Sequence, residues 1–179
     1  MSGFVNRRGP EQWQIISQAI DFRDLLVADL GCGHGDLLLK MREAGAVIVD
    51  GVDHDPEIVK TTRARCEGNG ISIHEEDLLE WLDKRLRYDL ILCFSVLPYM
   101  PSMHRTLKAI HAHSRRALIE CQYRGDGPGK VRDDAEMLWH LKHYWDRVRK
   151  IGATVVEYRN MERSIWLCEG SLQKGDTDE

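Results

Sequence analysis

A glycine-rich stretch, "VADLGCGHGD", runs from Val27 to Asp36. It follows a run of apolar residues and precedes "LLLKM", so it predicts a turn from a buried strand into a helix. The three alternate glycines, Gly31, Gly33 and Gly35, permit a tight turn and leave room for a ligand to reach the main chain. Asp29 adds a carboxylate two residues ahead of them.

Short apolar runs alternate with amphipathic segments along the rest of the chain. This alternation predicts right-handed β-α-β crossovers and an α/β fold, a doubly wound and mainly parallel sheet with helices on both faces. The last two runs are separated only by "RNME", which predicts a C-terminal antiparallel hairpin. The seven expected strands lie at residues 25–30, 47–53, 71–76, 89–95, 116–122, 153–158 and 163–169.

Capping residues and apolar spacing predict the helices between these strands. Asp55 is a natural N-cap ahead of Pro56, and Gly45 is a natural residue just past a helix end. The longest candidate has acids in its first turn and bases in its last, as the helix dipole favours. The predicted helices span residues 35–45, 55–70, 103–113 and 133–150, and a leading helix lies in "RRGPEQWQII".

Acidic residues close three successive strands of the predicted sheet. Asp29 ends the first and Asp53 the second, where a carboxylate can accept both hydroxyls of a ribose. Asp77 follows the third strand and could accept from an exocyclic amine such as that of adenine. Ligands of doubly wound sheets bind at the carboxyl ends of the strands, so we expect the three acids to form one row suited to cation, ribose and base.

The glycine pattern disfavours a dinucleotide cofactor. A pyrophosphate-binding turn would read G-x-G-x-x-G, but the third glycine arrives one residue early and Asp36 stands where it should be. Asp29 would also lie near the two phosphates. A ligand with a positive group suits this turn better.

These motifs together resemble the class I S-adenosylmethionine-dependent methyltransferases, which have a Rossmann-like fold. "DLGCGHG" is similar to the family's first motif, and "GVDHDP" to its acidic turn after the second strand. "EEDLLEW" follows the third strand, and "YDLILCFSVLPYM" is similar to the fourth-strand motif. With the terminal hairpin, the resemblance spans nearly the whole chain and implies S-adenosylmethionine as the cofactor.

The resemblance also implies a role for individual residues. Asp29 and the main chain at Gly31 and Gly33 would hold the methionine portion, and Asp53 the ribose hydroxyls. His54 would lie against the adenine or sugar, Asp77 would meet the adenine amine, and the Leu78 N–H would reach a ring nitrogen. Residues Cys93 to Ser95, with Phe94 at their centre, would line the floor near the sulfonium.

The acceptor side is less legible in the sequence. Tyr99 and Tyr123 follow the fourth and fifth strands and could face a substrate, although packing explains each equally well. The loop Arg124 to Lys130 could close over an acceptor or be a plain connection. Arg8 or Trp13 could cover the cofactor. The chain has "CFSVLPYM" where nitrogen methyltransferases of nucleic-acid bases often have Asn or Asp before Pro-Pro, which disfavours that type of target.

Composition narrows the class of protein. The chain has 179 residues, a net charge of −4 and five scattered cysteines, which indicate neither a disulfide framework nor a structural zinc site. The acidic balance gives no general attraction to nucleic acid or anionic lipid. His140 and His143 with Glu136 lack a further ligand, so we expect no metal there.

We therefore expect residues 1–170 to form a single methyltransferase domain and residues 171–179 to be a disordered tail. No apolar run suits a membrane span and the N-terminus does not read as a secretory signal, so a cytoplasmic location is expected. The acceptor is expected to be a small molecule, with nucleic acid or protein left open. A non-catalytic S-adenosylmethionine-binding partner subunit remains an alternative, and the sequence leaves the oligomeric state open.

Overall fold

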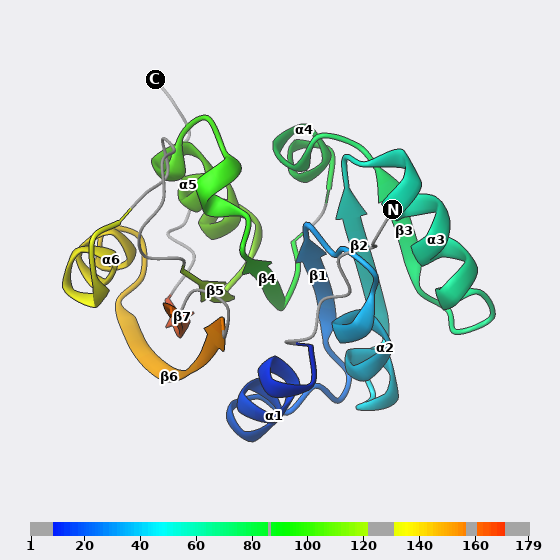
Figure 1. Ribbon diagram of the computed structural model, residues 1–179, viewed down its shortest axis with the longest axis horizontal. Helices are drawn as coiled ribbons and strands as arrows, with labels where there is room; N and C mark the ends of the chain where they lie inside the picture. Colours follow the sequence, from blue (N-terminus) through cyan, green and yellow to red (C-terminus); the bar gives the residue numbers. More distant parts are fainter. Residues whose placement is uncertain (1–8, 86, 122–130, 157–160, 171–179) are drawn as a thin grey trace.

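The computed structural model describes residues 9–85, 87–121, 131–156 and 161–170. Its strands form one seven-stranded sheet in the order β3-β2-β1-β4-β5-β7-β6 (Figure 1). They are β1 (Leu26–Leu30), β2 (Ile48–Asp53), β3 (Ser72–Glu75), β4 (Leu90–Phe94), β5 (Arg116–Glu120), β6 (Arg147–Val156) and β7 (Met161–Glu169). The first five pair in parallel, whereas β7 is antiparallel to both β5 and β6. The predicted doubly wound sheet and its terminal hairpin are confirmed.

Helices cover both faces of the sheet (Figure 1). One face packs against α1 (Gly9–Ala19), α2 (Asp36–Glu43) and α3 (Pro56–Cys66). The other packs against α4 (Leu78–Asp83), α5 (Met103–His113) and α6 (Asp134–Lys142). A short 3-10 helix, η1 (Leu97–Tyr99), follows β4.

Side chains of the central strands alternate between two hydrophobic cores. On β1, Val27 packs under α1 and α2, whereas Ala28 and Leu30 pack under α4 and α5. A strand that is buried on both faces must be apolar at successive positions, which explains the apolar runs of the sequence. Asp29 interrupts this run on the same face as Val27, because alternate residues of a strand share a face.

Several predicted helix ends are confirmed. The Asp55 side chain caps α3 by accepting from the amides of Glu57 and Ile58 at 2.9 and 3.3 Å. Gly45 follows the end of α2 with a φ of +101°, a conformation that glycine adopts without strain.

The predicted helix over 133–150 is wrong in its second half. α6 ends at Lys142, and β6 begins at Arg147 rather than at residue 153. The bases expected in a last helical turn alternate along this edge strand, with Arg147 and Arg149 exposed. Lys150 forms ion pairs with Asp134 and Glu162 at 2.9 and 2.6 Å. Pairing along the whole length of β7 outweighs the helical periodicity, which had counted Trp145 and Val148 as helix residues.

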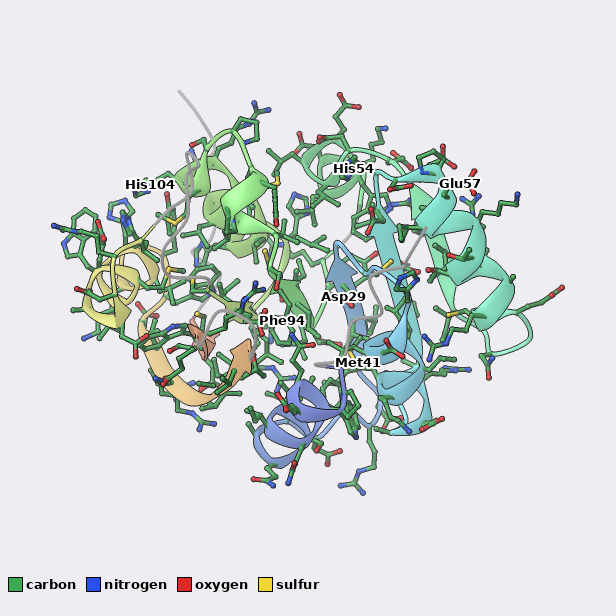
Figure 2. All side chains as sticks on the ribbon, in the orientation of Figure 1. Asp29, Met41, His54, Glu57, Phe94 and His104 are labelled. Carbon is green, nitrogen blue, oxygen red and sulfur yellow. The ribbon has the colours of Figure 1, made fainter. Side chains whose placement is uncertain are left out.

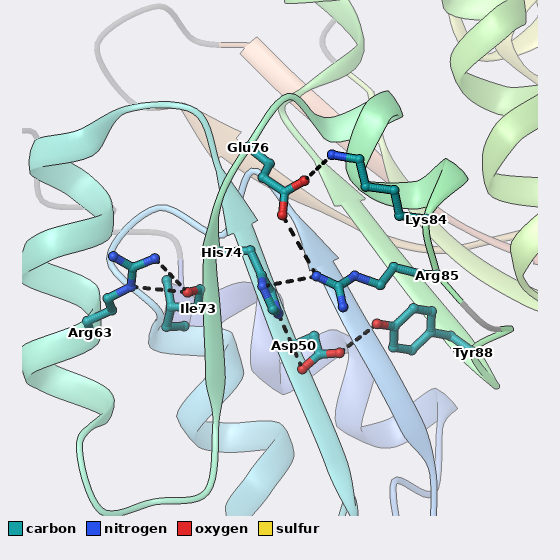
Figure 3. A network of polar contacts seen from close by, with 8 residues as sticks. All are labelled: Asp50, Arg63, Ile73, His74, Glu76, Lys84, Arg85 and Tyr88. Atoms are coloured by element: carbon teal, nitrogen blue, oxygen red, sulfur yellow. Dashed lines mark hydrogen bonds and ion pairs between the residues drawn. The ribbon is translucent and has the colours of Figure 1, made fainter.

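A polar network fastens α4 and the segment that follows it to β2 and β3 (Figure 3). The Tyr88 hydroxyl donates to Asp50 on β2 at 2.6 Å, and Asp50 lies 3.8 Å from His74 on β3. Arg85 lies 3.3 Å from the His74 ring and over the ring of Trp81, a buried residue of α4. These contacts hold α4 and the segment that follows it against β2 and β3.

Among the helices in the described residues, none is long and apolar enough to cross a membrane.

Candidate functional site

A pocket of about 490 Å³ opens at the carboxyl ends of the parallel strands. The chain adds β2 and β3 on one side of β1 and then returns to place β4 on the other side, so strand order reverses between β1 and β4. Loops diverge at such a point and leave a crevice. Residues of α1, of the β1–α2 turn, of the ends of β2 and β4, of the start of α4 and of η1 line the pocket.

Most of the residues that the sequence assigned to a cofactor line this pocket. From the first two strands come Asp29, Gly31, Gly33, Asp53 and His54. From the third and fourth come Asp77, Leu78 and Phe94. Their meeting follows from the sheet order, which places β1, β2 and β3 side by side. Which ligand group each residue contacts stays a prediction.

Main-chain hydrogen bonds and close packing at Gly31 fix the conformation of the glycine turn. The amide of Gly31 donates to Val52 at 2.8 Å, which ties the turn to β2. Gly31 has a φ of +70°, and a Cβ there would lie 2.5 Å from the Val96 side chain. Gly33 has a φ of +51°, with no atom within 4 Å of its would-be Cβ. Gly31 is therefore required for packing as well as conformation, and Gly33 leaves open space beside the main chain.

Helix α3 braces the same turn. The Thr62 hydroxyl donates to the Gly33 carbonyl at 2.6 Å, and Arg65 donates to the His34 carbonyl at 3.0 Å. Because α3 supplies both donors, the turn is fixed from outside the pocket.

Asp29 is a buried acid at the centre of the site (Figure 2). It is 4% exposed, and no described residue donates a hydrogen bond to its carboxyl group. Burial, followed by the charge of Asp53, raises the pKa of Asp29 to about 8. A positively charged group in the pocket would favour the ionised form of this carboxyl.

Asp53 is oriented by amides on both sides. It accepts from the Gly33 amide at 3.2 Å and from the Asp55 amide at 3.1 Å. His54 beside it is mostly exposed, with its Nδ1 atom 3.7 Å from Asp53. The carboxylate is therefore held in place, and His54 lies at the rim.

Asp77 has a structural task besides any ligand contact. Its Oδ1 atom caps α4 by accepting from the amides of Leu79 and Glu80 at 2.9 and 3.1 Å. Leu78 is buried at the first position of that helix. The two residues border the pocket because the helix starts at the end of β3.

The end of β4 meets only part of the expectation. Phe94 and Ser95 line the pocket, whereas Cys93 is fully buried in the core beneath α4 and α5. Side chains alternate along a strand, so Cys93 and Phe94 point to opposite faces. Ser95 has a φ of +61°, which is unusual outside glycine.

Cys32 also lines the pocket. Burial, followed by the charges of Asp29 and Asp53, raises the pKa of the Cys32 thiol. This thiol therefore stays protonated and is unsuited to act as a nucleophile.

The N-terminal helix contributes Gln12 rather than Trp13. Trp13 packs against Phe22 with ring centroids 5.2 Å apart and does not line the pocket. Gln12 is 1% exposed and does line it. The sequence carried a signal for this, since Gly9, Gln12 and Ile16 are spaced as one buried helix face. Arg8 lies outside the described residues.

Of the acceptor-side candidates, only Tyr99 can be placed. It is 79% exposed and lies at the pocket mouth with Met100 and Pro101. Tyr123 and the loop Arg124 to Lys130 lie outside the described residues, as do residues 171–179.

The histidines of α6 belong to a separate aromatic cluster. His140 and His104 pack edge to face with centroids 4.9 Å apart, and His104 Nδ1 lies 3.0 Å from the Tyr144 hydroxyl. Figure 2 shows His104 on α5, away from Asp29. Within the described ranges, no group of three or more His, Cys, Asp or Glu side chains could hold a metal ion.

Comparison with known proteins agrees with this geometry. The sequence profile of the family described as "Methyltransferase domain" matches residues 13–162, which include the strands and turns that border the pocket. The chain belongs to this methyltransferase family. The resemblance to the class I S-adenosylmethionine-dependent methyltransferases is thereby confirmed.

Individual relatives match part of the chain. A ribosomal protein L11 methyltransferase of Parasynechococcus marenigrum is 35% identical over 101 residues, which cover 52% of this chain and 35% of the relative. A ubiquinone biosynthesis O-methyltransferase of Coxiella burnetii is 31% identical over 101 residues, which cover 55% of this chain and 43% of the relative. The chain thus spans less than half the length of either relative.

Solved structures share the fold over nearly the whole chain. Magnesium protoporphyrin IX methyltransferase from Synechocystis PCC 6803, crystallised with bound S-adenosylmethionine, superposes with a TM-score of 0.73 at 21% identity. The superposition covers 96% of this chain and 87% of that one.

Proposed function

We propose that this protein is an S-adenosylmethionine-dependent methyltransferase that binds its cofactor in the pocket at the strand ends. The observation that carries the proposal is the row of Asp29, Asp53 and Asp77 around one pocket of about 490 Å³. Membership of the methyltransferase family supports it independently. A related fold that was crystallised with this cofactor supports it further.

The pocket residues fit the parts of the cofactor in order along the sheet. Asp29 and the open main chain at Gly33 suit the methionine portion, and Asp53 suits the ribose hydroxyls. Asp77 and Leu78 suit the adenine, because their positions beside α4 offer an acceptor and an apolar contact. His54 would cover the adenine or sugar from the rim.

The cofactor, when bound, supplies a methyl group already activated by a sulfonium. The task of the protein is then alignment, which needs a rigid pocket more than it needs an acid or a base. The braced glycine turn and the buried β4 end supply this rigidity. Phe94 and Ser95 lie at the end of β4, where a sulfonium and an acceptor atom would meet.

A small molecule is the acceptor that the site favours. The net charge of −4 gives no general attraction to a polyanion. Tyr99, Met100 and Pro101 form a mostly apolar rim that suits a partly apolar compound. One relative named above is a ribosomal protein methyltransferase, so a protein acceptor stays as an alternative, whereas another is named for ubiquinone biosynthesis. Nucleic acid is the further alternative.

A non-catalytic subunit that binds the same cofactor is the second candidate. It would use the same pocket, since the roles assigned above to Asp29, Asp53 and Asp77 all belong to cofactor binding. It would bind S-adenosylmethionine without turnover, for example to stabilise a partner enzyme.

We further propose that residues 1–170 form one methyltransferase domain, because one sheet unites the described elements and the family match spans 13–162. A cytoplasmic location is part of the same proposal.

Calorimetric titration of the purified chain with S-adenosylhomocysteine and, separately, with NAD tests the class of ligand. The proposal predicts binding of the first and not of the second. Release of S-adenosylhomocysteine from S-adenosylmethionine with a panel of phenols, carboxylic acids and amines then separates enzyme from binding subunit. Binding of NAD alone would reject the methyltransferase assignment.

A further inference from the structure

One wall of the pocket comes from α1 and presents an amide. Gln12 is almost fully buried, yet it lies among the residues that line the pocket, together with Asp29 and Gly31. A buried amide normally has partners for both of its polar atoms. The hydrogen-bond partners of the Gln12 amide therefore indicate which ligand group this wall of the pocket can bind.

Glu120 fixes the orientation of the Gln12 amide. Gln12 Nε2 donates to Glu120 Oε1 at 2.9 Å, and Glu120 is fully buried at the last position of β5. Both Glu120 oxygens also accept from hydroxyl groups, which is consistent with the amide nitrogen, the only donor of the Gln12 side chain, facing Glu120. The carbonyl oxygen of Gln12 is thereby turned elsewhere, and it has no hydrogen-bond partner among the described residues.

Glu120 is itself held by several elements. The Thr154 hydroxyl of β6 donates to its Oε1 atom at 2.9 Å, and the Ser95 hydroxyl donates to its Oε2 atom at 2.6 Å. Arg163 of β7 lies 3.9 Å from the same Oε2 atom. Because β6, β7 and the residue after β4 all hold this acid, the orientation that it imposes on Gln12 is a fixed feature of the fold.

Asp29 is a second acceptor in the same pocket. It points to the sheet face that α1 covers, as does Glu120, because Val27 and Leu118 at alternate positions pack there. No described residue donates a hydrogen bond to the Asp29 carboxyl group. Two buried acceptors without donors call for a ligand group that carries several N–H bonds and a positive charge.

We propose that the Gln12 carbonyl oxygen and the Asp29 carboxylate receive the α-ammonium group of the S-adenosylmethionine methionine portion, with Glu120 as the positioning residue that orients Gln12. This inference rests on the proposed function. It adds an α1 residue and a β5 residue to the binding of the amino-acid end, and it explains why an amide stands at a buried helix position.

Titration with two ligands isolates this contact. S-adenosylhomocysteine carries the amino-acid end, whereas 5′-methylthioadenosine keeps the adenosine and thioether and lacks it. Gln12→Ala is expected to weaken S-adenosylhomocysteine binding about tenfold and to leave 5′-methylthioadenosine binding unchanged. Gln12→Met, which keeps the side-chain length and removes both polar atoms, is expected to behave the same way if the alanine variant does not fold.

Two further variants complete the test. Gln14→Ala changes an exposed glutamine of the same helix and should bind both ligands as the wild type does. Glu120→Gln replaces the carboxylate by a group that can also donate, so the Gln12 amide is no longer forced into one orientation. Glu120→Gln is expected to weaken the binding of S-adenosylhomocysteine and not that of 5′-methylthioadenosine. A merely structural role of Glu120 would affect the binding of both ligands.

The outcomes separate this inference from the proposed function. If Gln12→Ala and Gln12→Met leave S-adenosylhomocysteine binding unchanged, or weaken both ligands equally, the α-ammonium contact is rejected while the cofactor site stands. If the wild type binds neither ligand, both the inference and the proposed function fail.

Discussion

Asp29 is the residue whose chemistry depends most on its surroundings. An aspartate normally ionises well below neutral pH, but burial and the nearby Asp53 raise the pKa of Asp29 to about 8. In the ligand-free protein it therefore carries a proton at neutral pH. An ammonium group beside it would expel that proton.

This linkage predicts pH-dependent binding of S-adenosylhomocysteine. Below pH 8 the ligand must displace a proton from Asp29, so its affinity should rise with pH between 6 and 8, by at most about tenfold per pH unit. Above the pKa of about 8 the contribution of Asp29 should level off. Calorimetry in buffers of different ionisation enthalpy would measure the released proton directly.

Asp29→Asn is the matched variant for this prediction, since it keeps the shape and cannot ionise. Its affinity should not vary with pH over this range. The imidazoles of His34 and His54 line the same pocket. The variants His34→Asn and His54→Asn therefore measure how much each histidine contributes to the pH dependence of binding. A slope that persists in Asp29→Asn would show that another group carries the proton.

Helix α4 serves the site by where it begins. Asp77 both caps this helix and borders the pocket. Asp77→Ala should therefore lower the free energy of unfolding by about 1 kcal/mol and also weaken S-adenosylhomocysteine binding. Asp77→Ser keeps a capping hydroxyl that is too short to reach an adenine amine, so it should weaken binding and leave stability nearly unchanged.

Chemical denaturation and calorimetry on the two variants would measure these effects. Equal losses of affinity and unequal losses of stability are the expected pattern. If Asp77→Ser bound S-adenosylhomocysteine as tightly as the wild type, Asp77 would be a helix cap alone.

The network behind α4 predicts a purely structural effect. Tyr88→Phe removes the donor to Asp50 from a largely buried site, which should lower the free energy of unfolding by about 1–2 kcal/mol. Tyr99→Phe removes the same hydroxyl from an exposed position and should leave stability unchanged. Equal unfolding midpoints for the two variants would show that the Tyr88 hydrogen bond contributes nothing measurable.

Helices and strands could be predicted from the sequence where short local patterns determine them. Strand runs, the Asp55 cap and the Gly45 helix end follow from short stretches of chain, and the structure reproduces them. The prediction for segment 143–150 was wrong because its apolar spacing suits a helix. Its actual conformation depends on pairing with β7, about 20 residues further along the chain. Pairing with a partner strand is a tertiary effect that local periodicity does not carry.

At the scale of the whole molecule, topology rather than local pattern assembles the site. The row of three acids was predictable, because successive parallel strands must end at one edge of the sheet. The Gln12–Glu120 contact joins residues 108 positions apart, and the Ser95–Arg163 contact joins residues 68 apart. No spacing rule connects such pairs, so Glu120 was missed although its place in the fifth strand was predicted.

The same topology explains why the acceptor is harder to read than the cofactor. The cofactor pocket uses strand ends that the fold itself brings together. The acceptor side depends on segments after β4 and β5, of which only Tyr99, Met100 and Pro101 lie at the described mouth. A search among small compounds is the natural continuation once cofactor binding is measured.

Calorimetric titration of S-adenosylhomocysteine into wild type, Asp53→Ala and Asp83→Ala tests the central claim most directly. Asp53 is oriented toward the pocket by two amides, whereas Asp83 is an exposed acid at the end of α4. Loss of a carboxylate that accepts two ribose hydroxyls should weaken binding about tenfold to a hundredfold, while Asp83→Ala should bind as the wild type does. Equal affinity of all three proteins, with Asp53→Ala still folded, would contradict the assignment of this pocket to S-adenosylmethionine.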